Sequence, residues 1–305
     1  MDHQRDTSGG RSRRFTYVPG FFEHDRQPTG PDKGFRANTL PGLGILDRHY
    51  DSEIGSSDNL QTGQTQWQRF MGYLQHLNQT APSGTSYKLL YIIRHGEGEH
   101  NVKEHEVGRH EWEAKWAHLE GDGSRTWADA ALTPKGEQQA KELNSFWRNS
   151  ISELHVPAPQ SIYSSPLRRC LQTTHLSFNH ITNGPASPLR FTISESLHEI
   201  SGKHTCDRRR SRSTIVSEWP DATILEPLTE NDELWHPDRR ETLEEAQARI
   251  EVFLDRLFEN DPEATYLALA MHSGAIRALH AALGHPDVWV AAGALVPVLV
   301  KCEQM

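Results

Sequence analysis

The sequence predicts an α/β fold, a three-layer α/β/α sandwich around a mostly parallel central sheet. Short apolar runs, of which residues 88–93 and 265–271 are the clearest, have the length and composition of buried strands. Segments with helical periodicity and recognisable starts lie between such runs. Strands that alternate with helices along a chain indicate a parallel sheet with helices on both faces.

The chain before residue 87 has a different character, with many Gly, Pro, Asp, Asn and Gln residues and weak periodicity. We interpret residues 1–14 as a disordered N-terminus and residues 15–86 as an extension that packs on the core, mostly over its surface. Within this extension, residues 15–22 and 65–77 are expected to be ordered, the second as a short helix. The main α/β domain is expected to span residues 87–305.

The strands and helices of the main domain follow from local signals. Thr133 and Pro134 suit the N-cap and first position of a helix. Thr242 and Glu245 form a capping box that starts another. Further helices are expected after the second strand, from near Pro166, and after the fourth. Five segments have the character of strands: 88–93, 161–165, 190–197, 265–271 and 294–303.

Composition argues against several classes of function. A net charge of −9 gives a nucleic-acid partner no general electrostatic support. No apolar run approaches the ~18 residues of a membrane span, and the first residues lack the apolar stretch of a secretory signal. We therefore expect a cytoplasmic protein without a membrane partner. Three scattered cysteines indicate reduced thiols. The oligomeric state stays open.

Two of the predicted strands end in a histidine. His95 follows the first strand and His272 the fourth, and ligands of open α/β sheets bind beyond the carboxyl ends of the strands. Arg94 adjoins His95, while Arg168 and Arg169 lie in the first turn of the helix after the second strand. The planar fork of arginine suits phosphate oxygens. The set therefore predicts a site for a small phosphorylated molecule.

Four segments together resemble the signature of the histidine phosphatase (phosphoglycerate mutase-like) superfamily, and of a fungal-type branch within it. The resemblance covers about residues 15–303 and implies a phosphoglycerate mutase-like fold. It assigns the phosphate-binding arginine to Arg169, and Cys170 stands where the family usually has alanine. The segments are Arg94-His95-Gly96-Glu97 with Asn101, Ser165 to Cys170, Ser196 to Glu199, and His272-Ser273-Gly274.

The resemblance implies catalytic roles for the matching residues. His95 would attack phosphorus and become a phosphohistidine. Arg94, Arg169 and His272 would neutralise the phosphate oxygens. Glu199 would protonate the leaving oxygen and later take a proton from water; an ordinary surface carboxylate is the alternative for this residue.

Asn101 and Ser273 are expected to contact the substrate. No metal or other cofactor is implied, because arginines and histidines supply the counter-charge. Histidines do recur every five residues between positions 95 and 110. That spacing puts successive side chains on different helical faces, unlike the zinc-binding arrangement four residues apart.

Five residues follow Glu199 closely enough to line the same site: His204, Asp207, Arg208, Arg209 and Arg210. We expect one or two of the arginines to contact a second anionic group on the substrate. The alternative is a solvated basic turn.

The expected activity is that of a metal-independent phosphatase acting on a small organic phosphate or pyrophosphate. A mutase is the first alternative. The resemblance implies that mutases of the family close the site with a basic tail, whereas this sequence reaches Met305 just beyond its last strand. This favours hydrolysis, unless the N-terminal extension forms the lid. The second alternative is a member recruited to other chemistry or to binding, for instance in specialised metabolism.

Overall fold

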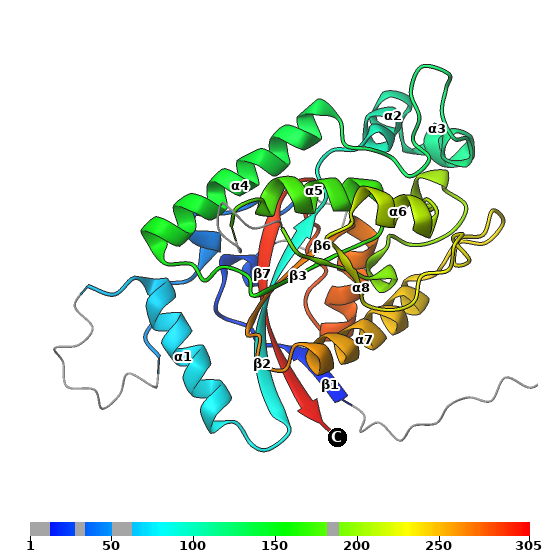
Figure 1. The fold of residues 1–305 in the computed structure, drawn as a ribbon. Helices are drawn as coiled ribbons and strands as arrows, with labels where there is room; N and C mark the ends of the chain where they lie inside the picture. Colours follow the sequence, from blue (N-terminus) through cyan, green and yellow to red (C-terminus); the bar gives the residue numbers. More distant parts are fainter. Residues whose placement is uncertain (1–12, 28–33, 51–62, 182–188) are drawn as a thin grey trace, which may run out of the picture.

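A computed structural model describes residues 13–27, 34–50, 63–181 and 189–305 (Figure 1). For residues 1–12 the expectation of disorder lies outside this part of the chain. For Arg13 and Arg14 it is wrong, because both belong to a strand that pairs with the last strand of the chain. The described strands form one mixed sheet in the order β1-β7-β2-β6-β3-β4-β5. The strands are β1 (Arg13–Tyr17), β2 (Thr85–Arg94), β3 (Ser161–Ser164), β4 (Thr192–Ile193), β5 (Thr223–Ile224), β6 (Tyr266–Met271) and β7 (Leu295–Gln304).

The sheet is parallel from β2 through β6, β3 and β4 to β5. The strand β7 is antiparallel to both of its neighbours, β2 and β1. The N-terminal extension thus adds β1 to the edge of the sheet. Among the described strands, only β7 runs opposite to the others. The sheet is therefore mostly parallel, as the sequence predicts.

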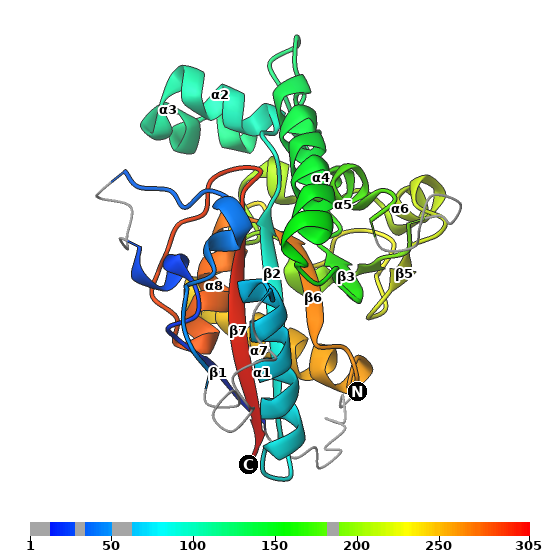
Figure 2. The same ribbon diagram turned by 90° about the vertical axis from the view of Figure 1, so that its left-hand side faces the viewer.

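Helices cover both faces of the sheet, and alternate residues of β2 point to the two layers (Figures 1 and 2). Leu90 and Ile92 pack in one core with residues of α7 and α8. Tyr91 and Ile93 pack in the other with residues of α1, α4 and α5. The helices are α1 (Gln66–Thr80), α2 (Glu99–Val107), α3 (Arg109–Ala114), α4 (Pro134–Leu154), α5 (Arg168–Phe178), α6 (Arg212–Glu218), α7 (Leu243–Asn260) and α8 (Ser273–Leu283).

Both predicted helix starts are present. The Thr133 hydroxyl accepts a hydrogen bond from the Gly136 N–H at the start of α4. At α7, the side chains of Thr242 and Glu245 each accept from the other residue's N–H, which is the expected capping box.

The segment 190–197 departs from the prediction of a full strand. Only Thr192–Ile193 is a strand, and a short 3-10 helix at Glu195–Leu197 follows. The Glu226 carboxylate binds the Ser194 hydroxyl at 2.9 Å and the Ser196 N–H at 2.8 Å. These bonds turn the chain away from the sheet soon after the strand begins.

The helix after β3 begins at Arg168 rather than at Pro166. The Ser165 hydroxyl accepts a hydrogen bond from the Leu167 N–H at 3.3 Å, so the chain between β3 and α5 forms a tight turn. This turn is part of the site described below.

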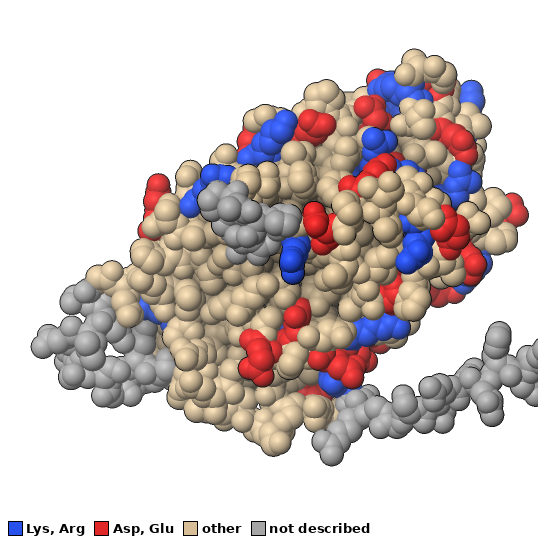
Figure 3. Space-filling model, in the orientation of Figure 1, with Lys and Arg blue, Asp and Glu red and all other residues tan. Residues whose placement is uncertain are grey.

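None of the helices in the described part of the chain has the length and hydropathy that a membrane crossing requires. On the face shown in Figure 3, basic and acidic side chains are interspersed rather than separated by sign. The helices α2 and α3 project beyond the carboxyl end of β2 (Figure 2). They form one wall around the edge of the sheet where His95 lies.

Candidate active site

His95 follows β2 directly, and its ring is held in one orientation. Its backbone N–H donates to the Met271 carbonyl of the neighbouring strand β6 at 3.1 Å. Its Nδ1 lies 2.7 Å from the Gly96 carbonyl oxygen. Because a carbonyl can only accept, Nδ1 carries the proton, and Nε2 keeps a free lone pair.

His95 is also held in its neutral form. Burial lowers the pKa of His95 well below 6.5, and the positive charges of Arg169 and Arg94 lower it further. A neutral imidazole with a free Nε2 is the form of histidine that acts as a nucleophile.

Arg94 and Arg169 are both anchored and both have hydrogen-bonding capacity to spare. Arg94 donates to the Val290 carbonyl at 2.9 Å. Arg169 donates to the Cys206 carbonyl at 2.6 Å and to the Asp207 carboxylate at 3.0 Å. The Nε–H of each arginine is buried without a partner among the described residues. Two rigid cations with free donors suit the oxygens of a phosphate group.

Two further histidines surround His95. The ring centroid of His272 lies 5.0 Å from that of His95, and the ring of His100 lies 5.6 Å away. Burial lowers the pKa of both well below 6.5, with Arg169 adding to the effect. The Nε2 atom of His272 lies 2.8 Å from the Ser165 hydroxyl in the turn before α5. Both rings are therefore neutral in the unliganded site.

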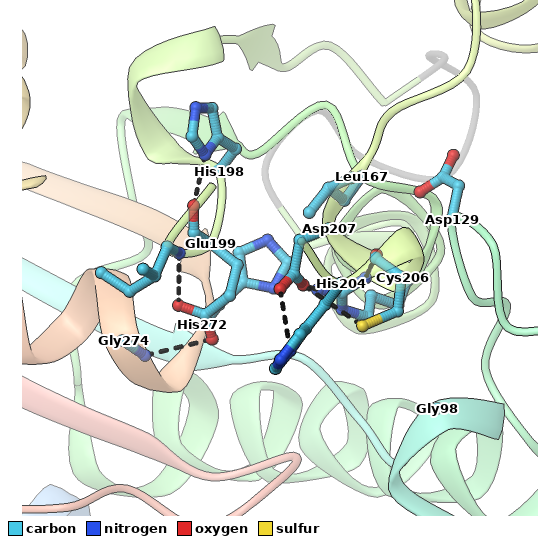
Figure 4. A network of polar contacts seen from close by, with 12 residues as sticks. Gly98, Asp129, Leu167, His198, Glu199, His204, Cys206, Asp207, His272 and Gly274 are labelled. Atoms are coloured by element: carbon cyan, nitrogen blue, oxygen red, sulfur yellow. Dashed lines mark hydrogen bonds and ion pairs between the residues drawn. The ribbon is translucent and has the colours of Figure 1, made fainter. Parts of the chain in front are cut away.

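Glu199 lies beside Gly274 at the first turn of α8 (Figure 4), and four donors converge on its carboxylate. The Ser273 hydroxyl and the Gly274 N–H donate to Oε2, each at 3.1 Å. The N–H groups of Ile200 and Ala275 donate to Oε1 at 2.9 and 3.1 Å. The carboxylate is thus bound at the positive end of a helix. It is not an ordinary surface carboxylate.

These side chains meet at a cavity with a volume of about 440 Å³. His272 lies buried behind His95, and three predicted residues, Arg208, Arg209 and Arg210, lie outside the cavity lining. Eight of the twelve residues predicted for the site line the cavity: Arg94, His95, Asn101, Arg169, Glu199, His204, Asp207 and Ser273.

Arg208 and Arg209 differ from the prediction because carboxylates outside the cavity bind them. Arg208 pairs with Glu120 on the protein surface. Arg209 pairs with Glu195 and also donates to the Thr229 carbonyl at 2.9 Å. The Arg209 side chain is only 1% exposed, so it is a buried structural ion pair and not a solvated turn.

Three of the predicted contact residues have protein partners of their own. The Asn101 side-chain oxygen accepts the Gly98 N–H at 3.0 Å at the start of α2. The Ser273 hydroxyl is committed to Glu199. His204 Nε2 lies 2.8 Å from the Glu113 carboxylate. Asn101 and Ser273 therefore shape the cavity through backbone and carboxylate contacts.

The cavity lining includes Asp207, as the sequence predicts, and several residues that sequence reasoning missed, among them Arg36, His100 and Arg240. Asp207 is buried and binds both Arg169, at 3.0 Å, and Arg240, at 3.3 Å. It fixes the orientation of the Arg169 guanidinium.

His204, Cys206 and Asp207 have ligand atoms within 4.8 Å of one another, as a metal site would (Figure 4). Asp207 is already paired with two arginines. Burial raises the pKa of Cys206 well above 9.0, and the charge of Asp207 adds to this effect. A protonated thiol and a neutralised carboxylate are poor ligands for a cation. This donor set does not fit a metal.

Comparison with known proteins gives consistent matches. The model of the histidine phosphatase superfamily (branch 1) matches residues 90–289. A probable phosphoglycerate mutase of Arthroderma benhamiae is 36% identical over 289 residues, 95% of this chain and 84% of that protein. A probable phosphoglycerate mutase of Saccharomyces cerevisiae is 34% identical over 232 residues, 70% of this chain and 79% of that protein. The crystal structure of a Bacillus anthracis phosphoglycerate mutase has a TM-score of 0.45 and 16% identity over 71% of this chain and 89% of its own.

The family match and the two fungal relatives confirm the resemblance drawn from the four motifs. Together with the mixed sheet and its two helical layers, they also confirm the expected fold class. The chain belongs to the histidine phosphatase superfamily (branch 1), whose members are phosphatases and mutases.

Proposed function

We propose that this enzyme is a phosphatase that hydrolyses a small organic phosphate or pyrophosphate through a phosphohistidine at His95. The state of His95 carries the proposal. Its Nδ1–H is bound to the Gly96 carbonyl, and its pKa is held well below 6.5 by burial, Arg169 and Arg94. Such a ring is ready to attack phosphorus through Nε2 at neutral pH.

In the first step Nε2 of His95 forms a bond to phosphorus, and the bond from phosphorus to the leaving oxygen breaks. Arg94 and Arg169 bind the phosphate oxygens as charge moves onto them, through donors that include their unpartnered Nε–H groups. A phosphate monoester has a second pKa of about 6 and can bring a proton with it. Glu199 passes that proton to the leaving oxygen.

In the second step a water molecule attacks the phosphohistidine. Glu199 takes a proton from the water, the bond between nitrogen and phosphorus breaks, and neutral His95 and inorganic phosphate result. Glu199 then returns the proton to phosphate. The donors that converge on Glu199 keep its carboxylate aimed at the cavity through both steps. The arginines supply the positive charge, so the proposal has no metal-dependent step.

The names of the two relatives favour mutase activity as a second candidate, in which the phosphoryl group returns to another hydroxyl. Both candidates share the phosphohistidine and differ in its acceptor. Release of inorganic phosphate marks hydrolysis, whereas conversion of 3-phosphoglycerate into 2-phosphoglycerate without phosphate release marks a mutase.

The test is to measure phosphate release by the full chain in the presence of a chelator, and to trap the phosphoenzyme by rapid acid-free quenching. The substrates are p-nitrophenyl phosphate, sugar phosphates, phosphoglycerates, inositol polyphosphates, nucleotides, and thiamine and prenyl pyrophosphates. We expect chelator-resistant release and a phosphoryl group mapped by mass spectrometry to the peptide that contains His95. A phosphoryl group on another residue, or none during turnover, would refute the mechanism.

Replacing Gly274 with alanine is expected to misplace Glu199. A Cβ at this position would lie 2.3 Å from Glu199 Oε1 and 2.5 Å from Ile200 Cγ1, so the carboxylate must move. A displaced proton donor costs roughly 10²-fold in rate. The loss should be large for an alkyl phosphate and small for p-nitrophenyl phosphate, whose leaving group needs no proton.

Steady-state kcat for the two substrates measures this difference. Gly72→Ala in α1 is the matched control, because a Cβ at Gly72 meets nothing within 4 Å. Equal losses on both substrates in Gly274→Ala would show that the donor role belongs elsewhere.

A further inference from the structure

The N-terminal extension places an arginine in the catalytic cavity. The Ala37 N–H donates to the Trp289 carbonyl at 2.7 Å, and the Ala291 N–H donates to the Ala37 carbonyl at 2.9 Å. Ala37 is buried, so water does not compete for these bonds. They fix the half-buried Arg36 beside Trp289, and both side chains line the cavity.

Two arginines contact the indole ring of Trp289. The Cζ atom of Arg36 lies 4.5 Å from the ring centroid, and that of Arg277 lies 4.7 Å from it. The Asp287 carboxylate accepts from Arg277 Nε at 3.1 Å and from the Trp289 indole N–H at 3.2 Å. Of the two arginines, Asp287 therefore pairs with Arg277 among the described residues. We call Arg36, Arg277 and Trp289 the Arg36 cluster.

The charges that line the cavity are not balanced. Among the described residues, Arg36 and Arg94 have no carboxylate in ion-pair contact. Within the described part of the chain, the Arg36 guanidinium donates to the carbonyl of its neighbour Phe35 at 2.8 Å and to no other acceptor. Stacking on Trp289 holds its guanidinium but leaves its charge in place. The lining contains six arginines and four carboxylates: Arg36, Arg94, Arg109, Arg169, Arg240 and Arg277, with Glu104, Glu113, Glu199 and Asp207.

The two unpaired arginines have different places in the cavity. Arg94 adjoins His95 and is anchored to the Val290 carbonyl, so it serves the phosphate that reacts. The guanidinium groups of Arg36 and of Arg277, which belongs to α8, both stack on the Trp289 ring. The cavity of about 440 Å³ lies in the range of sites for whole small molecules, roughly 300–1,000 Å³. It has room for more than one phosphate group.

We propose that the Arg36 cluster binds a second anionic group, a phosphate or a carboxylate, of a substrate whose reacting phosphate faces His95. The guanidinium of Arg36 supplies a planar pair of donors, and Arg277 supplies a second positive charge. The inference rests on the proposed function and narrows its substrates to small phosphorylated molecules with two anionic groups. It assigns the second-anion contact to the N-terminal extension rather than to Arg208 and Arg209.

The experiment compares substrates that differ in one anionic group. Glycerol 3-phosphate and 3-phosphoglycerate differ in a carboxylate, and fructose 6-phosphate and fructose 1,6-bisphosphate differ in a phosphate. We expect Arg36→Gln to lower kcat/KM for the preferred doubly anionic substrate about 10-fold or more, the worth of a charge-assisted hydrogen bond. Its singly anionic counterpart should change by less than about two-fold. A selective loss with 3-phosphoglycerate identifies the second group as a carboxylate, and a selective loss with fructose 1,6-bisphosphate identifies it as a phosphate.

Arg208→Gln is the matched control, because it removes the same charge outside the cavity. Calorimetric affinities of the same four compounds, measured on the His95→Asn protein with and without Arg36→Gln, repeat the comparison without turnover. Equal effects within each pair, or no effect on either pair, would overturn the inference. Absence of phosphate release from every substrate would instead overturn the proposed function, and the affinities would still decide the role of Arg36.

Discussion

His95→Asn is expected to lower kcat/KM by at least about 10⁴-fold, because no other group of the site can replace the nucleophile. Asparagine keeps a donor for the Gly96 carbonyl, which binds His95 Nδ1–H at 2.7 Å. It lacks the lone pair at Nε2 that attacks phosphorus. The backbone bond to the Met271 carbonyl does not depend on the side chain. The variant should therefore fold and bind substrate while forming no phosphoenzyme.

His100→Asn is the matched comparison for that variant. His100 is also buried and lies 5.6 Å from the His95 ring, but its Nδ1 has no partner among the described residues. We expect a loss of less than about 10²-fold, since this change alters packing near the nucleophile and not the nucleophile itself. Stopped-flow phosphate release at saturating enzyme separates the two variants. If His95→Asn kept a burst of phosphate release, another residue would be the nucleophile.

The reacting end of the site could be predicted from the sequence because its geometry is local to the strands. His95 and His272 follow two strands that are direct neighbours, β2 and β6. Parallel strands bring their carboxyl ends to one edge, so two histidines at strand ends must lie close together. Arg169 follows from the same rule, because it begins the helix after β3, the next strand in the sheet.

The substrate end could not be predicted, because it depends on contacts between distant parts of the chain. Arg36 reaches the cavity because the adjacent Ala37 forms a backbone bridge with Val290. Neither segment has a sequence pattern that predicts this bridge. Residues 208–212 contain four arginines. This density of positive charge led to the prediction that Arg208 and Arg209 bind an anionic group. Their carboxylate partners, Glu120 and Glu195, lie in other segments of the chain. The sequence does not indicate these ion pairs, which become visible only in the folded structure.

Secondary structure was predictable where local chemistry decides it. The caps at Thr133 and Thr242 involve residues within one turn of each other. The strand predicted over 190–197 failed after Ile193, because the Glu226 side chain competes for the polar groups of Ser194 and Ser196. A residue from a later loop thus limits the strand to Thr192–Ile193, although the alternating pattern runs further.

Acidification is expected to destabilise the folded protein steeply below pH 6.5, because several histidines are buried without charge. Burial lowers the pKa of each in the folded state, and the value for His198 falls to about 3. Below 6.5 the unfolded chain binds the protons that the folded chain excludes, so the free energy of unfolding falls with pH. Each such group contributes a slope that approaches about 1.4 kcal/mol per pH unit about one unit or more below pH 6.5. The histidines concerned are His95, His100, His198, His272 and His280.

His280 allows this effect to be isolated, because it lies in α8 away from the cavity lining. Burial lowers its pKa well below 6.5, with the charges of His285 and Arg277 adding to the effect, and neither ring nitrogen has a partner among the described residues. His280→Leu should reduce the pH slope of the unfolding free energy by about 0.7 kcal/mol per unit at pH 6.5, and by an amount that approaches about 1.4 kcal/mol per unit near pH 5. Urea denaturation across that range measures it, with the exposed His76→Leu as control. An unchanged slope in His280→Leu would mean that His280 gains a proton in the folded state as readily as in the unfolded chain. The apolar packing of α8 against β2 opposes such protonation.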